Sequence, residues 1–286
     1  MKLEVLVSCM YQKNTDIVRK TRINTDVLII NQTNFMGWDI TETHNQLIRL
    51  FNTTERGLSR SRNTALHHAT GDICLICDDD EILADNYKDI ICQAFEKIPD
   101  AAIIAFDVKN KTTRFKPRIQ QVRRIGSLKL ASYQLALKRE SILKAGVYFD
   151  TFMGAGSGNG CGEENKFLWD CIRKQLKIYY VPIAIGQVCH GPSTWFFGYD
   201  RQFFYNRGAA TRHMMGLFPS IFYGIYYLVV KYHMYGKNLS FIHATKALFQ
   251  GIYDDPINQQ MTKSNGGQML SKSYPLSSLP IMWRNT

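Results

Sequence analysis

Four consecutive acidic residues, Asp78, Asp79, Asp80 and Glu81, directly follow a run of apolar residues in the segment GDICLICDDDEIL. Adjacent carboxylates repel one another, so such a cluster disfavours folding unless a cation or solvent compensates its charge. Carboxylate oxygens are ligands for Mg²⁺ and Mn²⁺, together with water and substrate phosphates. The cluster therefore predicts a divalent-cation site, and a solvated turn is the alternative.

A second pair of acids, Glu163 and Glu164, follows the glycine-rich segment GAGSGNGCG at residues 154–162. Apolar residues at helical spacing come next, so the two glutamates open a predicted helix whose dipole favours an ionised carboxylate. An ionised carboxylate within reach of a hydroxyl can act as a general base. Two helix-terminal acids that serve stability alone are the alternative. The glycine-rich segment lacks the spacing of a phosphate-binding loop, and we expect it to move over a bound acceptor.

The elements that must position these acids alternate between strands and helices. Apolar runs predict strands at 3–9, 26–32, 45–52, 72–77 and 101–108. Apolar residues at helical spacing predict helices at 57–71 and 87–98. This alternation predicts an α/β fold with a mostly parallel central sheet flanked by helices. Ligands bind such sheets beyond the carboxyl ends of the strands, which is where the acidic cluster lies.

Composition limits the class of protein. The chain has 286 residues and is 45% hydrophobic and 21% charged, which is typical of a globular protein. Its formal net charge is +11. The segment MKLEVLVSCMYQ has no features of a signal peptide, and seven cysteines without framework spacing favour reduced thiols in the cytoplasm. Cys74 and Cys77 form a CxxC pair, but on a strand they point to opposite faces, so core thiols are favoured over a metal chelate.

The positive charge is concentrated in places. Residues 109–124 carry seven Lys or Arg and no acid. We interpret them as a solvated loop or as a face for phosphates or anionic lipid, because no nucleic-acid-binding motif is present.

The C-terminal part changes character. Residues 214–230, MMGLFPSIFYGIYYLVV, are nearly all apolar but short for a membrane span, which needs about 20 residues. We expect one domain over 1–195, divided at about residue 110, then an aromatic-rich helical extension over 196–260 and a tail over 261–286. Tyr226, Lys231 and Tyr232 suit contact with an anionic membrane surface. A cap on the domain or a homodimer contact is the alternative.

Two segments together resemble glycosyltransferase family 2. The first is ERGLSRSRNTALHHATGDICLICDDDEI, in which a helix near Ser-x-x-Arg-Asn precedes Gly-Asp and a buried strand ending in Asp-x-Asp. The second is GCGEENKFLWDCIRKQLKIYYVP, which is similar to the family's later motif of Gly-Glu-Asp or Gly-Glu-Glu at the start of a helix. The resemblance covers about residues 1–195, and it implies a catalytic domain there with a nucleotide-sugar half at about 1–110 and an acceptor half at about 111–195. It implies an inverting, metal-dependent enzyme with the Rossmann-like GT-A fold.

The resemblance also implies roles for particular residues. Asp78 and Asp80 are the Asp-x-Asp pair, and Asp80, Asp78 and the late His190 are the expected ligands of Mn²⁺ or Mg²⁺. Glu164 aligns with the family's usual base, and Glu163 would contact the acceptor or orient the loop. Contacts with the nucleotide-sugar are expected from Cys9, Tyr11, Asn31, Arg62, Asp78 and Asp79, with Arg62 pairing with the diphosphate or with an acid of the cluster.

The expected activity is transfer of a sugar from a nucleotide-sugar, most often UDP-linked in this family, to a glycan acceptor. A lipid-linked acceptor in bacterial surface polysaccharide or capsule synthesis would place the enzyme in the cytoplasm or on the inner face of the cell membrane. The chain has Asn31-Gln32-Thr33-Asn34 where family members often have Asp-Asp-Gly-Ser, so the acid with which family members contact the nucleotide base is missing. Alternatives are a sugar-nucleotide pyrophosphorylase, whose Gly-rich, Arg-containing loop is absent after the first strand, and a non-catalytic module that binds glycan or membrane.

Overall fold

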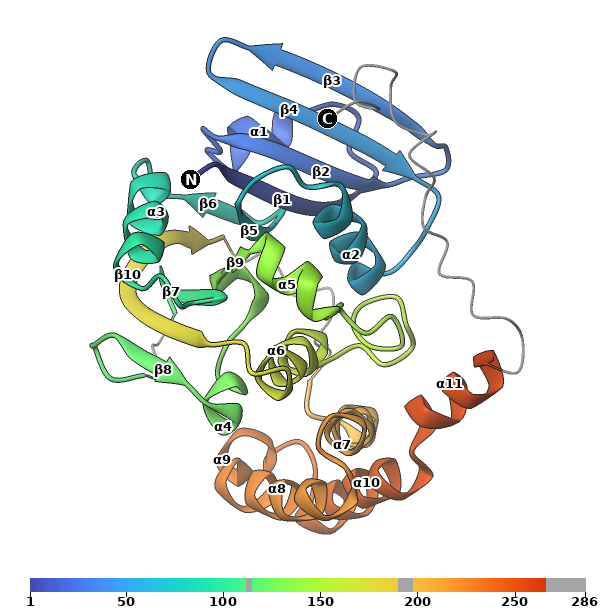
Figure 1. The fold of residues 1–286 in the computed structure, drawn as a ribbon. Helices are drawn as coiled ribbons and strands as arrows, with labels where there is room; N and C mark the ends of the chain where they lie inside the picture. The colour runs from blue at the N-terminus through green and yellow to red at the C-terminus, as the bar shows by residue number, and fades with distance from the viewer. Residues whose placement is uncertain (112–114, 190–197, 266–286) are drawn as a thin grey trace. The chain divides into compact units, whose positions relative to one another are not determined.

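The structure is a computed structural model that describes residues 1–111, 115–189 and 198–265. The chain divides into two units (Figure 1). The first, here the sheet unit, comprises Met1–Asp150 and Glu163–Pro192, and the second, here the helical unit, comprises Thr151–Gly162 and Ser193–Thr286. The glycine-rich segment therefore groups with the helical unit, whereas the glutamates that follow it group with the sheet unit.

A ten-stranded sheet forms the centre of the sheet unit, in the order β3-β4-β2-β1-β5-β9-β7-β10-β6, with β8 paired to β10. The strands are β1 (Leu3–Met10), β2 (Asp26–Gln32), β3 (Gly37–Thr43), β4 (Gln46–Thr53), β5 (Ile73–Asp78), β6 (Glu81–Leu83), β7 (Ile103–Lys109), β8 (Gln120–Val122), β9 (Leu135–Lys138) and β10 (Ile178–Val188). The neighbours β4, β2, β1 and β5 run parallel, as do β7 and β10. The pairings made by β3, β6, β8 and β9 are antiparallel, so the sheet is mixed around a parallel centre.

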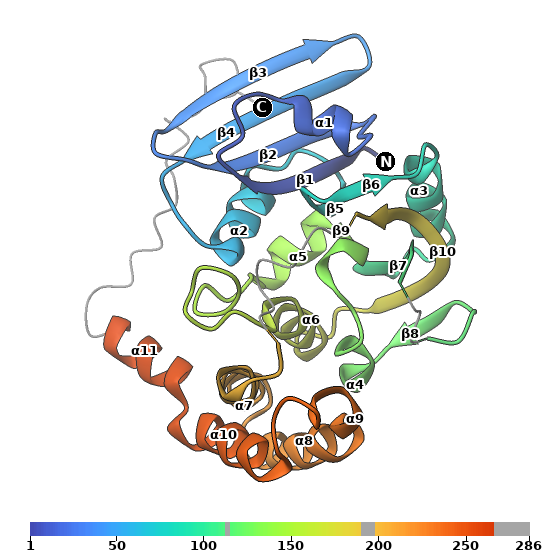
Figure 2. The ribbon, with the colours of Figure 1, turned by 180° about the vertical axis from the view of Figure 1, so that it is seen from behind.

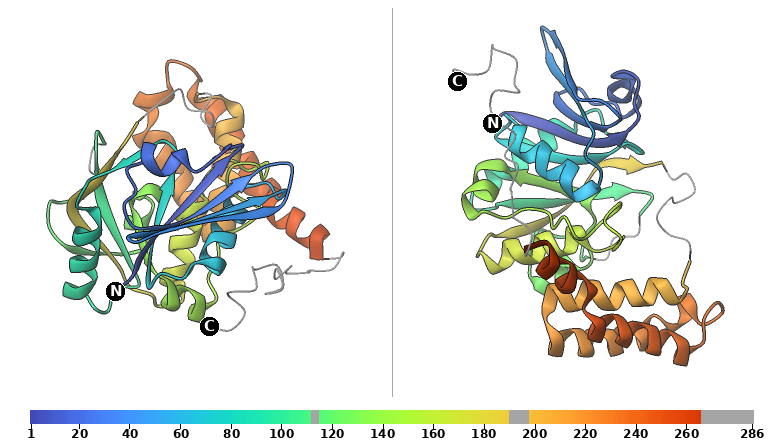
Figure 3. Two further views of the ribbon diagram at one scale, coloured as in Figure 1. Left: turned by 90° about the horizontal axis from the view of Figure 1, so that it is seen from above. Right: turned by 90° about the vertical axis from the view of Figure 1, so that its right-hand side faces the viewer.

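Helices cover both faces of this sheet (Figures 2 and 3). On one face lie α1 (Asp16–Lys20) and α3 (Tyr87–Lys97), and on the other lie α2 (Leu58–His68), α5 (Arg139–Ala145) and α6 (Glu163–Arg173). Two short helices, α4 (Arg124–Ser127) and the 3₁₀ helix η1 (Ser132–Gln134), lie in the connections. Cys77 belongs to the core on the face covered by α1 and α3, and Cys74 to the core on the face covered by α2, α5 and α6. This confirms that the two thiols point to opposite faces.

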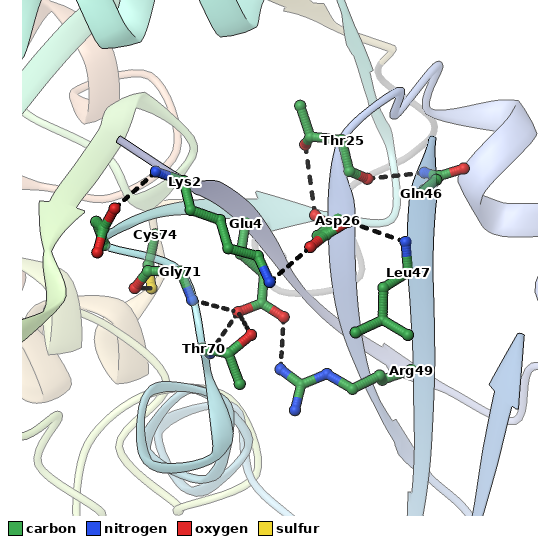
Figure 4. A network of polar contacts seen from close by, with 11 residues as sticks. Lys2, Glu4, Thr25, Asp26, Gln46, Leu47, Arg49, Thr70, Gly71 and Cys74 are labelled. Atoms are coloured by element: carbon green, nitrogen blue, oxygen red, sulfur yellow. Dashed lines mark hydrogen bonds and ion pairs between the residues drawn. The ribbon is translucent and has the colours of Figure 1, made fainter. Parts of the chain in front are cut away.

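A buried ion pair joins the amino ends of the central strands (Figure 4). Glu4 of β1 is fully buried, and one of its oxygens lies 2.5 Å from Nη2 of Arg49 in β4. Its other oxygen accepts the backbone N–H groups of Thr70 (2.6 Å) and Gly71 (2.9 Å), in the turn between α2 and β5. A Cβ at Gly71 would lie 2.7 Å from the Cβ of Glu4. Only glycine fits there, and the turn that precedes β5 is thereby held against β1.

The helical unit contains α7 (Arg201–Met215), α8 (Leu217–Val230), α9 (Tyr232–Tyr235), α10 (Phe241–Asp254) and α11 (Pro256–Asn265). Helices α7 and α10 touch through glycines: a Cβ at Gly208 would lie 2.1 Å from the carbonyl oxygen of Leu248, and one at Gly251 would lie 2.0 Å from that of Tyr205. Within residues 1–111, 115–189 and 198–265, no helix has the length and apolar character that crossing a membrane requires.

Candidate active site

The acidic cluster lies where the sequence predicts it, at the carboxyl end of β5. Asp78 is the last residue of β5, and Asp79 and Asp80 form the turn to β6. Glu81 is 5% exposed, and its Oε1 accepts the backbone N–H of Asp78 at 2.8 Å. The carbonyl oxygen of Asp80 accepts the N–H of Cys189, which follows β10, at 2.8 Å. A buried carboxylate and a neighbouring strand therefore fix this turn.

Burial and neighbouring carboxylates act together on the acids of this cluster. Burial, followed by the charges of Asp80 and Asp78, raises the pKa of Asp79. Burial, followed by the charge of Asp78, raises the pKa of Glu81 well above its usual range. Raised carboxyl pKa values are expected where like charges share a partly dry site.

The donor set fits a divalent cation that is shared with a substrate. In the part of the chain that the structure describes, no group of three or more His, Cys, Asp or Glu side chains is arranged to hold a metal. Mg²⁺ and similar hard cations need only one or two carboxylates when water and substrate phosphates complete the shell. Asp78 and Asp80 suit that arrangement. His190, the third expected ligand, lies outside the described residues.

Arg62 joins the acidic cluster to the start of α6. Its guanidinium, on α2, is 2% exposed, with Nη2 at 3.1 Å from Oδ1 of Asp78 and Nη1 at 3.2 Å from Oε1 of Glu163. Burial acts to lower the pKa of Arg62, but Asp78, Glu163 and Glu164 together raise it. Arg62 therefore stays charged and contacts Asp78, one of the partners expected for it. One cation thus connects acids that are 85 positions apart in the sequence (163 − 78).

Ser132 and Phe149 contact Arg62, and Asn63 in turn holds Phe149. None of these three residues is among the predicted site residues. The hydroxyl of Ser132 accepts from Nη2 of Arg62 at 2.8 Å and donates to Oδ2 of Asp78 at 3.4 Å. The ring of Phe149 lies 5.5 Å from the guanidinium and stacks on Phe167 of α6 at 4.1 Å. The side chain of Asn63 bonds both the N–H and the carbonyl of Phe149, each at 2.8 Å. Asn63 and Phe149 thereby lock α2 to α6 beside the ion pairs.

Glu163 and Glu164 differ in their surroundings. Glu163 is 8% exposed and is bound by Arg62. Burial, followed by the charge of Glu163, raises the pKa of Glu164 to about 8. We expected the helix dipole to favour the ionised form, and at Glu164 this expectation is wrong, because desolvation and a neighbouring carboxylate outweigh the dipole. Glu164 is consequently a stronger base than an ordinary glutamate, once it is deprotonated.

The residues expected at the nucleotide end lie at the carboxyl ends of β1 and β2. Asn31 is fully buried, and its amide bonds the N–H (2.9 Å) and carbonyl (2.8 Å) of Gln12 and Oδ1 of Asn52 (2.8 Å). Cys9 is 3% exposed, and burial raises the pKa of its thiol to about 12. Tyr11 is 58% exposed, with the Arg56 guanidinium 5.5 Å from its ring. Asn31 and Cys9 shape the strand ends, and Tyr11 presents a ring to solvent.

The chain is similar to known proteins both in sequence and in fold. Residues 15–156 match the family model described as Glycosyl transferase family 2. The structure of S. aureus TarS 1-349 in complex with UDP-GlcNAc is similar, with 12% identity over 93% of this chain and 75% of that chain and a TM-score of 0.54. The complex of TarS 1-349 with UDP is similar with 13% identity, 95% coverage of each chain and a TM-score of 0.53. A search of curated proteins finds no match. The structural likeness confirms the predicted α/β fold of the GT-A type.

Proposed function

Because the chain belongs to glycosyltransferase family 2, we propose that it is an inverting, metal-dependent hexosyltransferase that moves a sugar from a UDP-sugar to a hydroxyl of a glycan acceptor. The observation that carries this proposal is the bridge that Arg62 makes between Asp78 and Glu163. It places an acid suited to the donor and an acid suited to the acceptor in one buried network. The similar TarS structures contain UDP-GlcNAc and UDP, which supports UDP as the nucleotide.

The donor side of the site consists of the turn after β5. Asp80 and Asp78 would hold Mn²⁺ or Mg²⁺, with His190 as the third expected ligand. When bound, such an ion supplies positive charge that stabilises a diphosphate leaving group. Arg62 and Ser132 keep the Asp78 carboxylate oriented through both of its oxygens. On the nucleoside side we expect contacts from Asp79 and from Tyr11, whose exposed ring is available for stacking on the nucleotide base. Cys9 and Asn31, which we also expected to make contact, are buried and instead shape the ends of β1 and β2.

The acceptor side consists of the start of α6. The acceptor oxygen attacks C1 of the sugar, the bond from C1 to the diphosphate oxygen breaks, and its electron pair leaves with the UDP. Glu164 takes the proton of the acceptor hydroxyl, and its raised pKa makes it well suited to this step. Glu163, held by Arg62, orients the acceptor. We propose a lipid-linked acceptor in bacterial surface polysaccharide synthesis, which would place the enzyme at the inner face of the cell membrane.

Glu164→Gln tests this assignment. The assay measures the release of UDP from UDP-sugars, with water as the acceptor and Mn²⁺ present. Calorimetry measures donor binding. Loss of a positioned base lowers the rate by about 10²–10⁴-fold, while UDP binding should be unchanged. The matched control is Glu140→Gln, because Glu140 is an exposed glutamate paired with Lys144 on α5. A wild-type rate for Glu164→Gln would exclude Glu164 as the base. If the wild-type protein binds no nucleotide, the non-catalytic binding module becomes the better account.

A further inference from the structure

Helix α8 is apolar on two opposite sides. On one side it buries Ser220, Gly224, Tyr227 and Leu228, and a Cβ at Gly224 would lie 2.6 Å from the side chain of Leu248 in α10. The other side, which we call the α8 face, consists of exposed residues at helical spacing along the whole helix, namely Phe218, Phe222, Ile225, Tyr226, Val229 and Val230. The packing of the helical unit explains the first side and leaves the second in contact with solvent.

The α8 face is large for an exposed apolar surface. Phe218 and Phe222 are each 73% exposed. At roughly 200 Å² for each phenyl side chain, these two residues alone expose about 300 Å², and the other four add to that area. Monomeric soluble proteins rarely expose contiguous apolar patches beyond a few hundred Å², and larger ones mark interaction surfaces. Tyr232 is 47% exposed, and its ring centroid lies 6.1 Å from that of Phe241. It extends the surface past the end of α8.

Charge indicates what this surface contacts. Residues 214–240, which include α8 and α9, contain Lys231 and Lys237 and no Asp or Glu. Lys231 directly follows α8. Elsewhere in the helical unit basic residues have acidic neighbours: Arg212 pairs with Asp255, and the cavity lined by Arg201, His243 and Lys246 is also lined by Asp254. An apolar helix face that is followed by a lysine-containing segment without acids suits a bilayer whose interior is apolar and whose headgroups are negatively charged.

The length of α8 determines how it would meet such a surface. Its 14 residues span about 21 Å at 1.5 Å per residue, which is less than the hydrocarbon thickness of about 30 Å. A helix of this kind lies in the plane of the interface, with its apolar side chains below the headgroups. Exposed tyrosines such as Tyr226 and Tyr232 are residues that favour the headgroup level.

We propose that the α8 face docks the chain on the surface of an anionic phospholipid bilayer. Phe218 and Phe222 enter the acyl boundary, and Lys231 and Lys237, which follow α8, contact lipid phosphates. This docking deepens the proposed place of action at a membrane, but it requires no transfer activity. A vesicle-binding result and a sugar-transfer result can therefore succeed or fail separately.

Flotation of the full chain with phosphatidylcholine vesicles, with and without phosphatidylglycerol, tests the proposal. Ile225→Glu changes the α8 face, and Ile183→Glu is the matched control, because Ile183 is 47% exposed, against 48% for Ile225, but lies on β10 of the sheet unit. Wild type and Ile183→Glu should float with anionic vesicles, less so at high salt. Ile225→Glu and Phe222→Glu should bind roughly tenfold more weakly or worse, because each replaces an inserted apolar side chain with a charge. Unfolding curves for each variant show that the fold is retained.

Three results would overturn the proposal. Equal binding to vesicles with and without phosphatidylglycerol would remove the anionic requirement. Unchanged binding by both α8 variants would show that another surface makes the contact. Absence of vesicle binding, together with a wild-type dimer that Ile225→Glu converts to a monomer in light scattering, would identify the α8 face as an interface between two copies of the chain.

Discussion

Replacing Arg62 by methionine should destabilise the protein strongly and impair its donor site. The two ion pairs of Arg62, at 3.1 and 3.2 Å, each correspond to a Coulomb energy of about 5 kcal/mol at an effective dielectric constant of 20. Desolvation of the charges cancels much of this energy. Removing one partner of a buried pair costs about 3–5 kcal/mol, because a charge is left without compensation. The Asp78 side chain is 27% exposed and that of Glu163 is 10% exposed, so Glu163 should contribute most of the loss.

Urea unfolding measures this loss, and Arg49→Met is the matched control. Arg49 is also a buried arginine with a buried carboxylate partner, but its pair with Glu4 joins the amino ends of the strands. Both variants should unfold at lower urea, while only Arg62→Met should lose the extra stability that UDP with Mn²⁺ gives. Adding Glu163→Gln to Arg62→Met should restore part of the lost stability. The reasoning is refuted if Arg62→Met unfolds at the wild-type urea midpoint and keeps its full response to UDP and Mn²⁺.

Three other predictions concern Glu164 and Gly71. The pKa of Glu164 is about 8 in the folded protein against 4.5 in the unfolded chain, so between these values the folded protein keeps a proton that the unfolded chain loses. The contribution of Glu164 to stability is therefore complete below about pH 4.5 and disappears as the pH rises through about 8. Glu164→Gln should flatten the pH dependence of the unfolding free energy between those values, and an unchanged slope would contradict the assignment. The value of kcat/KM for donor hydrolysis should rise with pH through about 8, because the base must be ionised. Gly71→Ala should lower the free energy of unfolding by about 1–3 kcal/mol, since its Cβ would meet Glu4, and a wild-type melting temperature would argue against that contact.

Much of the sheet unit could be predicted from hydrophobic pattern. The strand at 72–77 and the helix at 87–98 correspond closely to β5 and α3, because each buries a regular set of apolar residues. Strand β3 was not predicted, since it forms the edge of the sheet and none of its residues is buried. An edge strand that buries little has no strong periodic signal. The antiparallel pairings of β9 with β5 and β7 depend on chain reversals that local pattern does not encode.

The candidate site divides in a similar way. Asp78 and Glu164 belong to motifs with recognisable neighbours, so the sequence indicated them. Ser132 is an isolated serine that becomes important only because η1 brings it to Arg62 and Asp78. The raised pKa of Glu164 also had no signal in the sequence, because it arises from burial within the fold. Contacts between residues far apart in the chain require the three-dimensional structure.

The central claim is that the acids after β5 form a metal-dependent nucleotide-sugar site. Thermal unfolding with UDP, GDP, dTDP and CMP, each with and without Mn²⁺, tests it on wild type, Asp80→Ala and the exposed control Asp85→Ala. One nucleotide, which we expect to be UDP, should stabilise wild type and Asp85→Ala only with Mn²⁺, by about 2.7 kcal/mol at a hundredfold excess over its Kd. Asp80→Ala should lose that response. A response that Asp80→Ala retains, or no response to any nucleotide, would contradict the claim.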